Sequence, residues 1–250
     1  MATARFRFHG ELSRFLPRPR REAAFDYACA RAATLKNAIE ALGVPHTEAA
    51  LVFVNRAPAT LARIVREGDS VEVWPWQTPE EGQTTISGGN RGLSLIFVAD
   101  AHLGGLARFL RMLGFDTLHE NAFADAEIRR LAWQEGRVVL TRDRELLKCR
   151  EIARGCYVHA RKPEAQLQEV AARYALAARA RPFTLCLLCN RVLEPVEKAA
   201  VLGRLPPEVA ARHDSFRRCA GCERIYWPGS HYERMREALR RSIDSGGLDA

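Results

Sequence analysis

Apolar and polar residues along the first 76 positions follow the pattern of a small domain built from strands and one helix. Residues 3–9 alternate between apolar and basic side chains, which predicts a strand with one buried face. Residues 34–43 predict a short amphipathic helix that ends at Gly43. Further strands are predicted at 23–29, 51–55 and 70–75. The predicted order is therefore β-β-α-β-β.

A different pattern begins at Leu93, after a polar segment rich in Gly, Thr and Glu at 77–92 that we expect to be a linker. From there, predicted strands and helices alternate along the chain, which is typical of a parallel sheet in an α/β fold. We predict strands at 94–99, 115–119, 137–141 and 155–159. We predict helices at 102–113, 124–135, 143–149 and 163–178.

The first of these helices has the clearest periodicity. One apolar stripe repeats at three- and four-residue steps through Leu103, Leu106, Ala107, Leu110 and Leu113. We expect Arg108 and Arg111 to project from a different face of the helix.

Beyond residue 180 the periodicity breaks down into a segment that carries cysteines, and a basic amphipathic helix is predicted after it. The expected organisation is an N-terminal domain at 1–76, a linker at 77–92, an α/β domain at 93–180, a cysteine-bearing segment at 181–228, and a basic helix and tail at 229–250.

The composition is that of an ordinary folded protein, with 47% hydrophobic and 27% charged residues in 250 positions. No apolar run approaches the ~20 residues of a membrane span, and the N-terminus lacks the apolar core of a signal peptide. We therefore expect a cytoplasmic protein with no membrane partner.

The net charge of +8 is unevenly distributed. Residues 1–81 contain 11 Lys and Arg against 10 Asp and Glu, whereas residues 93–241 contain 26 against 18. A positive surface of this kind attracts nucleic acid, and a solvated Arg-rich surface is the equally weighted alternative.

Four of the seven cysteines form two Cys-x-x-Cys pairs, Cys186 with Cys189 and Cys219 with Cys222. This is the ligand spacing of a structural Zn²⁺ site, in which four thiolates close the coordination shell. A redox Cys-x-x-Cys is the weaker alternative, because two such pairs occur in an Arg-rich setting. Nearby aromatic residues would either stack on bases or pack the small core of this segment: Tyr226, Trp227 and Tyr232.

Two predicted strands end on an aspartate, Asp100 and Asp143, and a third acid, Asp125, lies near the start of a predicted helix. Functional groups collect where the carboxyl ends of parallel strands meet, and convergent carboxylates there would hold Mg²⁺ or Mn²⁺. Glu127 lies two positions after Asp125 and is the weaker candidate ligand. Each strand-end aspartate alternatively serves as the N-cap of the helix that follows it. Arginines near these acids are candidate phosphate contacts: Arg108, Arg111, Arg142 and Arg144.

The stretches FVADAHLGGLARFLRMLGFDT, FADAEIRRLA and RVVLTRDRELL resemble the Mut-seven C-terminal RNase domain family, a branch of the PIN-like nucleases. The resemblance covers about residues 94–228 and implies a PIN-like α/β fold followed by a zinc ribbon. It also implies metal-dependent RNA cleavage with Asp100, Asp125 and Asp143 as the acidic set. The family tends to have Met-Leu-Gly-Lys after its first aspartate, whereas this chain has His102 to Gly105, so that the helix-borne lysine is missing.

The stretches RFRFHGELSRFL, TLKNAIEALGVPHTEAALVFVN and EGDSVEVWP resemble the ubiquitin-like domain that often precedes this RNase domain, a β-grasp fold similar to the sulfur-carrier proteins. Those carriers require a free C-terminal Gly-Gly, and here Gly88-Gly89 is followed by the rest of the chain. The resemblance therefore favours a docking or RNA-presenting role with a protein partner.

The sequence supports three functions. The first is a metal-dependent ribonuclease whose zinc ribbon assists RNA binding. The others are a non-catalytic RNA-binding or RNA-processing accessory, in which the acids are only helix caps, and a ubiquitin-like adaptor protein.

Overall fold

The computed structural model describes residues 1–76 and 95–229, together with Glu233 and Glu237. The predicted linker with Gly88-Gly89, the predicted C-terminal helix and Tyr232 lie outside the described residues. The chain forms two compact units. The first comprises Met1–Leu93 and Asp125–Tyr157, and the second comprises Ser94–Ala124 and Val158–Ala250.

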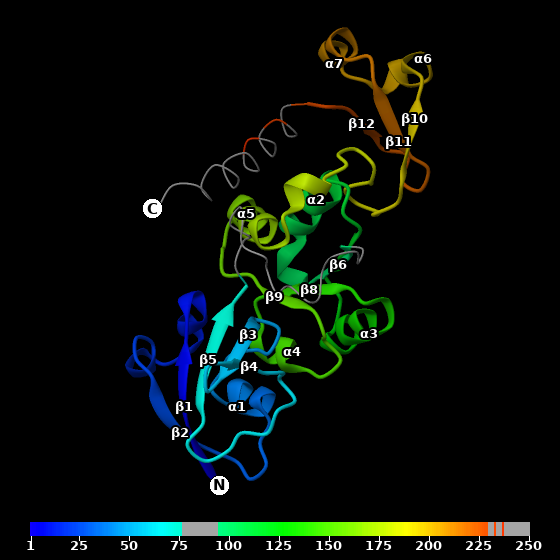
Figure 1. Cartoon of the computed structure of the whole chain (residues 1–250). Coiled ribbons are helices and arrows are strands. Elements are labelled where there is room, and N and C mark those ends of the chain that lie inside the picture. Colours follow the sequence, from blue (N-terminus) through cyan, green and yellow to red (C-terminus); the bar gives the residue numbers. More distant parts are fainter. Residues whose placement is uncertain (77–94, 230–232, 234–236, 238–250) are drawn as a thin grey trace. The chain divides into compact units, whose positions relative to one another are not determined.

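The N-terminal residues form a mixed five-stranded sheet with one helix (Figure 1). The strand order is β2-β1-β5-β3-β4, in which the central strands β1 and β5 run parallel and the outer pairs are antiparallel. The strands are β1 (Ala2–Phe8), β2 (Phe25–Cys29), β3 (Ala49–Val54), β4 (Ala57–Pro58) and β5 (Ser70–Pro75). The predicted β-β-α-β-β order is confirmed, and only the two-residue strand β4 was not predicted.

Helix α1 (Leu35–Ala41) packs its buried face into the core of this domain. Its N-cap Thr34 and Asn37 form a capping box, which satisfies backbone N–H groups at the helix start. Leu35 and Ile39 are fully buried in one cluster with Phe6 of β1. Two short 3-10 turns, η1 (Gly10–Phe15) and η2 (Arg18–Arg20), lie between β1 and β2.

The first unit also contains four elements from the middle of the chain: α3 (Asp125–Glu135), β8 (Val138–Thr141), α4 (Arg144–Lys148) and β9 (Gly155–Tyr157). Strands β8 and β9 pair in parallel, with Leu140 opposite Cys156. All four residues of β8 are buried, as expected for a parallel strand covered on both faces.

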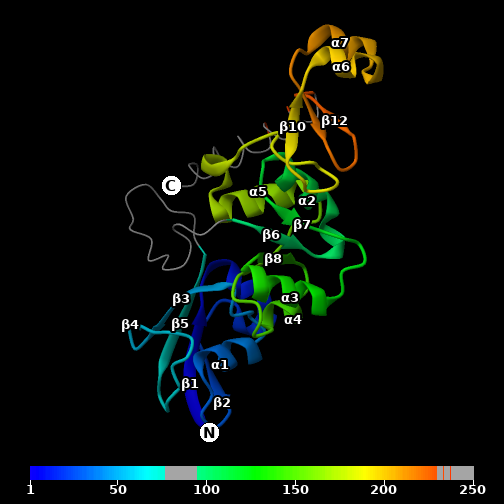
Figure 2. The same cartoon turned by 90° about the vertical axis from the view of Figure 1, so that its right-hand side faces the viewer.

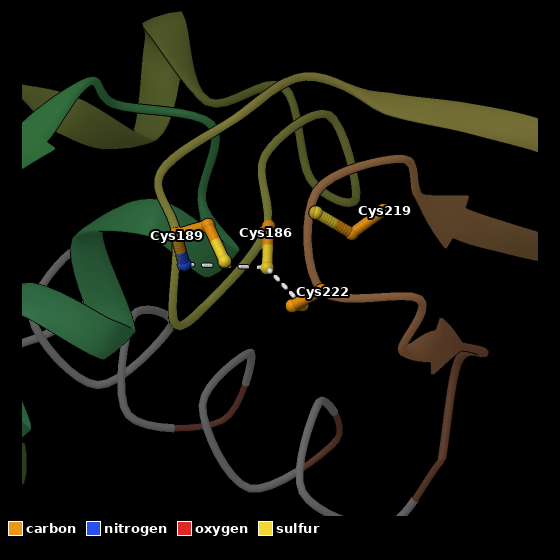
Figure 3. Close-up of side chains that lie close together, drawn as sticks. All are labelled: Cys186, Cys189, Cys219 and Cys222. Atoms are coloured by element: carbon orange, nitrogen blue, oxygen red, sulfur yellow. Dashed lines mark hydrogen bonds between the residues drawn. The ribbon is translucent and has the colours of Figure 1, made fainter.

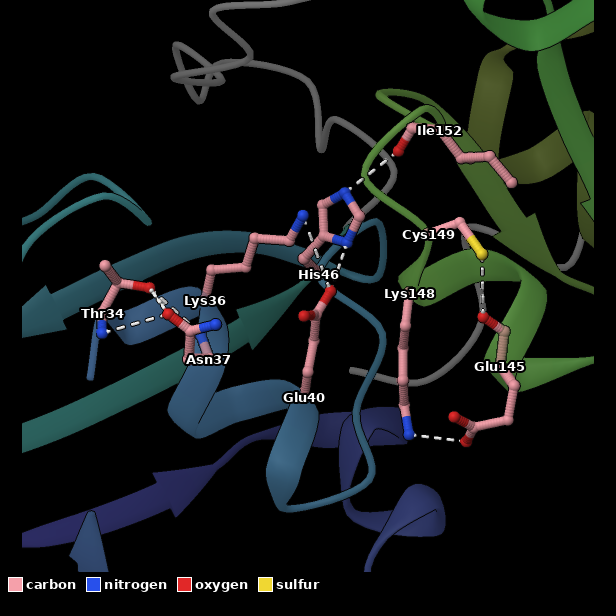
Figure 4. A network of polar contacts seen from close by, with 9 residues as sticks. All are labelled: Thr34, Lys36, Asn37, Glu40, His46, Glu145, Lys148, Cys149 and Ile152. Carbon is pink, nitrogen blue, oxygen red and sulfur yellow. Dashed lines mark hydrogen bonds and ion pairs between the residues drawn. The ribbon is translucent and has the colours of Figure 1, made fainter. Parts of the chain in front are cut away.

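The N-terminal domain packs directly on these elements (Figure 4). The His46 ring lies between the Glu40 carboxylate, at 2.7 Å, and the carbonyl oxygen of Ile152, at 3.0 Å. The buried Glu48 carboxylate accepts a hydrogen bond of 2.8 Å from the backbone N–H of Tyr157. The chain therefore joins the β-grasp domain to β9 by side-chain contacts in addition to the backbone.

The second unit contains the parallel pair β6 (Phe97–Ala99) and β7 (Thr117–Leu118). A 3-10 turn, η3 (Ala101–Leu103), leads into α2 (Gly104–Met112), which lies beside α5 (Pro163–Tyr174) in both views (Figures 1 and 2). A turn η4 (Leu176–Arg179) follows α5, and all five residues of the predicted α2 stripe are buried. The predicted α/β fold class is confirmed, whereas the predicted domain boundaries stay predictions.

The cysteine-bearing segment forms a three-stranded antiparallel sheet in the order β10-β11-β12. The strands are β10 (Leu193–Val196), β11 (Phe216–Cys219) and β12 (Ile225–Tyr226). The loop between β10 and β11 contains α6 (Lys198–Val201), η5 (Leu202–Arg204) and α7 (Pro207–Arg212), which the sequence pattern did not predict.

Within the described part of the chain, no helix combines the length and apolar character needed to cross a membrane.

Gly114 lies where the end of α2 contacts the segment before the cysteines, so a substitution at Gly114 tests this packing. Its φ is +86°, and a Cβ atom there would overlap the carbonyl oxygen of Arg181. We expect Gly114→Ala to lower the free energy of unfolding by at least ~2 kcal/mol in urea titrations, because it adds left-handed strain to backbone overlap. Gly203→Ala is the matched control, since a Cβ at Gly203 meets no atom within 4 Å. Equal midpoints for the two variants would contradict this packing.

Candidate functional site

The four cysteines of the two Cys-x-x-Cys pairs converge on one point (Figure 3). Their sulfur atoms all lie within 4.8 Å of one another, and among the described residues this is the one group of three or more His, Cys, Asp or Glu with that property. Cys186 and Cys219 are buried, Cys222 is half-buried and Cys189 is exposed. Four soft thiol ligands at this spacing fit a tetrahedral Zn²⁺ ion.

The two pairs share one backbone geometry, although their sequences differ. In each, the residue four positions after the first cysteine donates its N–H to the carbonyl of that cysteine at 2.9 Å, Asn190 to Cys186 and Glu223 to Cys219. Asn190 and Glu223 both adopt positive φ, +59° and +57°. The same turn therefore forms at both pairs, and the four sulfur atoms that it carries lie within 4.8 Å of one another.

The sulfur atoms differ in their electrostatic environment. Burial alone would raise the pKa of Cys186, but hydrogen bonds from the Tyr226 hydroxyl, at 3.1 Å, and from the backbone N–H groups of Leu188 and Cys189 bring that pKa to about 7. A hydrogen bond with Cys222, burial and the neighbouring Cys186 raise the pKa of Cys189 to about 12. Without a cation the cluster resists further ionisation, because several thiolates at this distance repel one another.

Tyr226 and Trp227 have packing roles in this segment. Tyr226 packs against the small cysteine-lined core, and the Trp227 ring lies 6.5 Å from that of Phe216. This favours core packing over base stacking for both aromatic residues.

Arg111 anchors the first cysteine pair to α2. Its Nη1 donates to the carbonyl oxygens of Leu187 and Leu188 at 2.9 and 2.8 Å, and its Nε donates to that of Thr117 at 2.9 Å. Only 5% of Arg111 is exposed. The expectation that Arg111 projects from α2 alongside Arg108 is wrong, because the returning cysteine segment covers it, and we omit Arg111 from the phosphate contacts.

Asn190 makes a second attachment of the same cysteine pair. Its side-chain amide donates to the Asp116 carboxylate at 2.6 Å and accepts from the backbone N–H of Thr117 at 3.1 Å. The stretch from Arg111 to Thr117 is part of the motif FVADAHLGGLARFLRMLGFDT, and it therefore binds the first cysteine turn. In the sequence, only Arg111 and Asp116, which lie among apolar residues, indicated this contact.

Asp100 and Asp143 both act as helix caps. The Asp100 carboxylate accepts from the N–H of Ala101 at 2.6 Å. Oδ1 of Asp143 accepts from the N–H groups of Glu145 and Leu146 at 2.7 and 3.4 Å. The prediction that both aspartates cap helices is thus confirmed. At Asp143 both cap hydrogen bonds go to the same carboxylate oxygen, Oδ1.

The three candidate acids are divided between the two units. Asp143 and Asp125, the first residue of α3, are exposed in the first unit, and Asp100 is half-buried in the second. Their convergence is not a property of either unit alone, so it stays a prediction. Glu127 is engaged by Arg130 at 2.6 Å, in keeping with its lower rank as a candidate ligand.

The remaining candidate arginines are all exposed. Arg144 donates to the carbonyl oxygen of Phe15 at 3.4 Å, and its guanidinium lies 5.1 Å from the centre of the Phe15 ring. It therefore contacts the N-terminal domain from the residue next to Asp143. Arg108 and Arg142 stay candidate phosphate contacts.

Gly105 stands where the Met-Leu-Gly-Lys motif of the family has its lysine, and the packing around Gly105 explains why. A Cβ atom on Gly105 would lie 2.6 Å from Cγ of Pro163, the first residue of α5. A lysine at this position would therefore force α2 and α5 apart. His102, two positions after Asp100, is an exposed polar residue in the same segment.

Arg111 and Arg108 form a matched pair on α2 for testing the anchor. We expect Arg111→Met to lower the free energy of unfolding by at least ~2 kcal/mol, because it leaves three carbonyl groups without their donor. Hydrogen exchange at Asn190 and Thr117 should accelerate in the same variant. Arg108→Met removes an exposed guanidinium and should leave both measurements unchanged. An Arg111→Met protein with unaltered exchange would show that the anchor is dispensable.

Comparison with known families gives two matches, which lie side by side along the chain. Residues 96–239 match the Mut7-C RNAse domain, and residues 1–81 match the Mut7-C ubiquitin domain. We found no match to the chain among curated proteins or among solved structures. Because the first family model covers more than half of the sequence, the chain belongs to the Mut7-C RNAse domain family, with the Mut7-C ubiquitin domain preceding the RNase domain.

Proposed function

We propose that this protein is a metal-dependent ribonuclease that cleaves RNA phosphodiesters at an aspartate-lined site, and that its cysteine segment binds structural zinc. Membership of an RNase domain family suggests a nuclease-like function. The observation that carries the finer proposal is the geometry of Asp143, which follows the buried strand β8 and, among the described residues, accepts its cap hydrogen bonds through one carboxylate oxygen only. A cap with a spare oxygen has the capacity to ligate a cation as well.

The donor set fits a hard divalent cation. Asp100, Asp125 and Asp143 would hold Mg²⁺ or Mn²⁺, since these ions prefer carboxylate oxygen and retain several waters. Such an ion, when bound, lowers the pKa of a water and stabilises the leaving oxygen. Exposed Asp125 and Asp143 leave room for those waters and for substrate.

The chain's own residues would orient the RNA. Exposed Arg108 and Arg142 would neutralise phosphate charge, and the excess of basic residues after Leu93 would attract the RNA backbone. Asp143 would be held in one orientation by its two cap hydrogen bonds and by the contact of the adjacent Arg144 with Phe15. A fixed carboxylate loses little conformational entropy when it binds a cation.

The second candidate is a non-catalytic RNA-binding accessory, which the double capping by Asp100 and Asp143 favours. In that case the same surface would bind RNA without cleaving it. A protein partner of the N-terminal domain and a cytoplasmic location stay predictions.

Asp143→Asn separates capping from catalysis, because Asn caps a helix about as well as Asp but lacks the charge that a metal ligand needs. We expect the Mn²⁺-dependent cleavage rate of single-stranded RNA to fall by about a hundredfold or more, with thermal stability nearly unchanged. Glu145→Gln, an exposed carboxylate two residues further on, is the control and should retain full activity. If Asp143→Asn cleaves like the wild type, the proposed aspartate-lined site is wrong. If the wild type binds RNA and never cleaves it, the accessory function is correct.

Zinc content tests the cysteine cluster independently of cleavage. We expect protein purified without chelator to contain about one zinc ion per chain, and Cys222→Ser to lose most of it because one thiolate ligand is gone. Chelation should also increase hydrogen exchange in β10 and β11, because metal binding supplies folding free energy. Cys149→Ser, a half-buried thiol at the end of α4, is the matched control and should keep its zinc. Equal metal content in the two variants would refute the assignment.

A further inference from the structure

Helix α3 presents an exposed tryptophan beside a hollow in the surface. The hollow has a volume of about 240 Å³ and is lined by Ala126, Arg129, Arg130, Trp133, Gln134 and Glu151. Trp133 is 70% exposed, and among the described residues no other aromatic side chain is exposed. A single exposed apolar side chain is common on protein surfaces, so the indole is of interest here because it lies beside a hollow that two arginines also line.

Trp133 is not part of the core formed by the described residues. The buried face of α3 consists of Ile128, Leu131 and Ala132, and these residues complete the packing of the helix. The spacing of three and four residues places Arg129, Arg130 and Trp133 together on the opposite, outer face. Burial in the core therefore does not account for the indole.

The two arginines differ in how they are held. Arg130 is fixed by the Glu127 carboxylate, with hydrogen bonds of 2.6 and 2.8 Å. The Arg129 side chain is 38% exposed, and its Nη1 lies 4.0 Å from Glu151, a longer distance than the 2.6 Å between Arg130 and Glu127. Arg129 is thus the less tightly held cation beside the indole and the one available to an anion.

We propose that this hollow is a subsite for an unpaired RNA base, which stacks on the Trp133 indole while Arg129 binds the adjacent phosphate. The inference rests on the proposed ribonuclease function and names the substrate as single-stranded. An aromatic face stacks on any base and an arginine pairs with any phosphate, so the subsite recognises the single strand and not its sequence.

The position of the hollow along α3 agrees with this assignment. The helix begins at Asp125, a candidate metal ligand, and Trp133 lies eight residues further, about 12 Å along the helix axis. A strand cleaved near Asp125 would thus reach the subsite within a few nucleotides. A double helix does not fit this role, because its bases are paired and stacked on one another.

The test uses the full chain carrying Asp143→Asn, so that RNA is bound without being cleaved, and a fluorescein-labelled single-stranded oligouridylate as the probe. We expect Trp133→Ala to weaken binding by about tenfold, as measured by fluorescence anisotropy, and Trp133→Phe to recover most of that loss. Arg129→Gln should lower the slope of log affinity against log salt by about 0.7, the value for one phosphate contact on a single strand. Ile64→Ala, which truncates a 51% exposed apolar side chain in the N-terminal domain, is the control and should bind like the parent.

Three results would overturn the subsite: equal affinity of Trp133→Ala and the parent, an equal loss for a blunt duplex of the same length, or a change in self-association by sedimentation velocity without a change in RNA affinity. The last result would assign Trp133 to a protein interface. Cleavage assays on the chain with Asp143 intact distinguish a failure of the proposed ribonuclease function from a failure of the subsite. If Trp133→Ala loses RNA binding and the wild type does not cleave RNA, the subsite is correct and the nuclease function is wrong. If the wild type cleaves RNA and Trp133→Ala binds RNA like the parent, the nuclease function is correct and the subsite is wrong.

Discussion

The buried guanidinium of Arg111 is the interaction on which the second unit depends. Burial lowers the pKa of Arg111, and the nearby Glu120, Cys186 and Asp116 oppose that shift. Because a buried charge without partners costs several kcal/mol, the three carbonyl acceptors around this side chain are a condition of the fold. Two of those acceptors belong to the first cysteine turn. Four thiolates around Zn²⁺ would carry a net charge of about −2, so the metal centre and the arginine would stabilise each other across the end of α2.

The apolar periodicity was sufficient to predict α2 and its buried stripe but not the burial of Arg111. Periodicity reports which positions face the nearest sheet, whereas Arg111 is covered by a segment more than seventy residues later in the chain. The same limit applies to the ribbon. Cys-x-x-Cys spacing predicts that the sulfur atoms converge, because the constraint is local, but α6 and α7 in the intervening loop have too few residues to show a helical pattern. Long-range contacts and very short elements are therefore what the sequence pattern leaves open.

The candidate acids show how a cap and a ligand become confused in sequence. An aspartate that follows a buried strand and precedes a helix has both roles available, because the helix start requires an acceptor and the strand end is where α/β proteins place their sites. At Asp143 the two roles are compatible, since both cap bonds use Oδ1. Capping also fixes the carboxylate, which a metal site requires. Because one aspartate is able to fill both roles, a substitution that preserves the cap and removes the charge is needed to separate the two functions.

The N-terminal domain is an integral part of the unit that carries Asp125 and Asp143. Glu48 is nearly fully buried, and its carboxylate is stable there because the N–H of Tyr157 donates to it. The Phe15 ring lies 5.2 Å from the Tyr157 ring, and the same Phe15 contacts Arg144 through its carbonyl group and its ring. A domain attached only by its chain would leave these polar groups hydrated. Because they are instead satisfied by one another, removal of the ubiquitin-like domain would expose β9 and the start of α4, the helix that Asp143 caps. The domain thus contributes to the conformation of the candidate site, whichever partner its other surfaces bind.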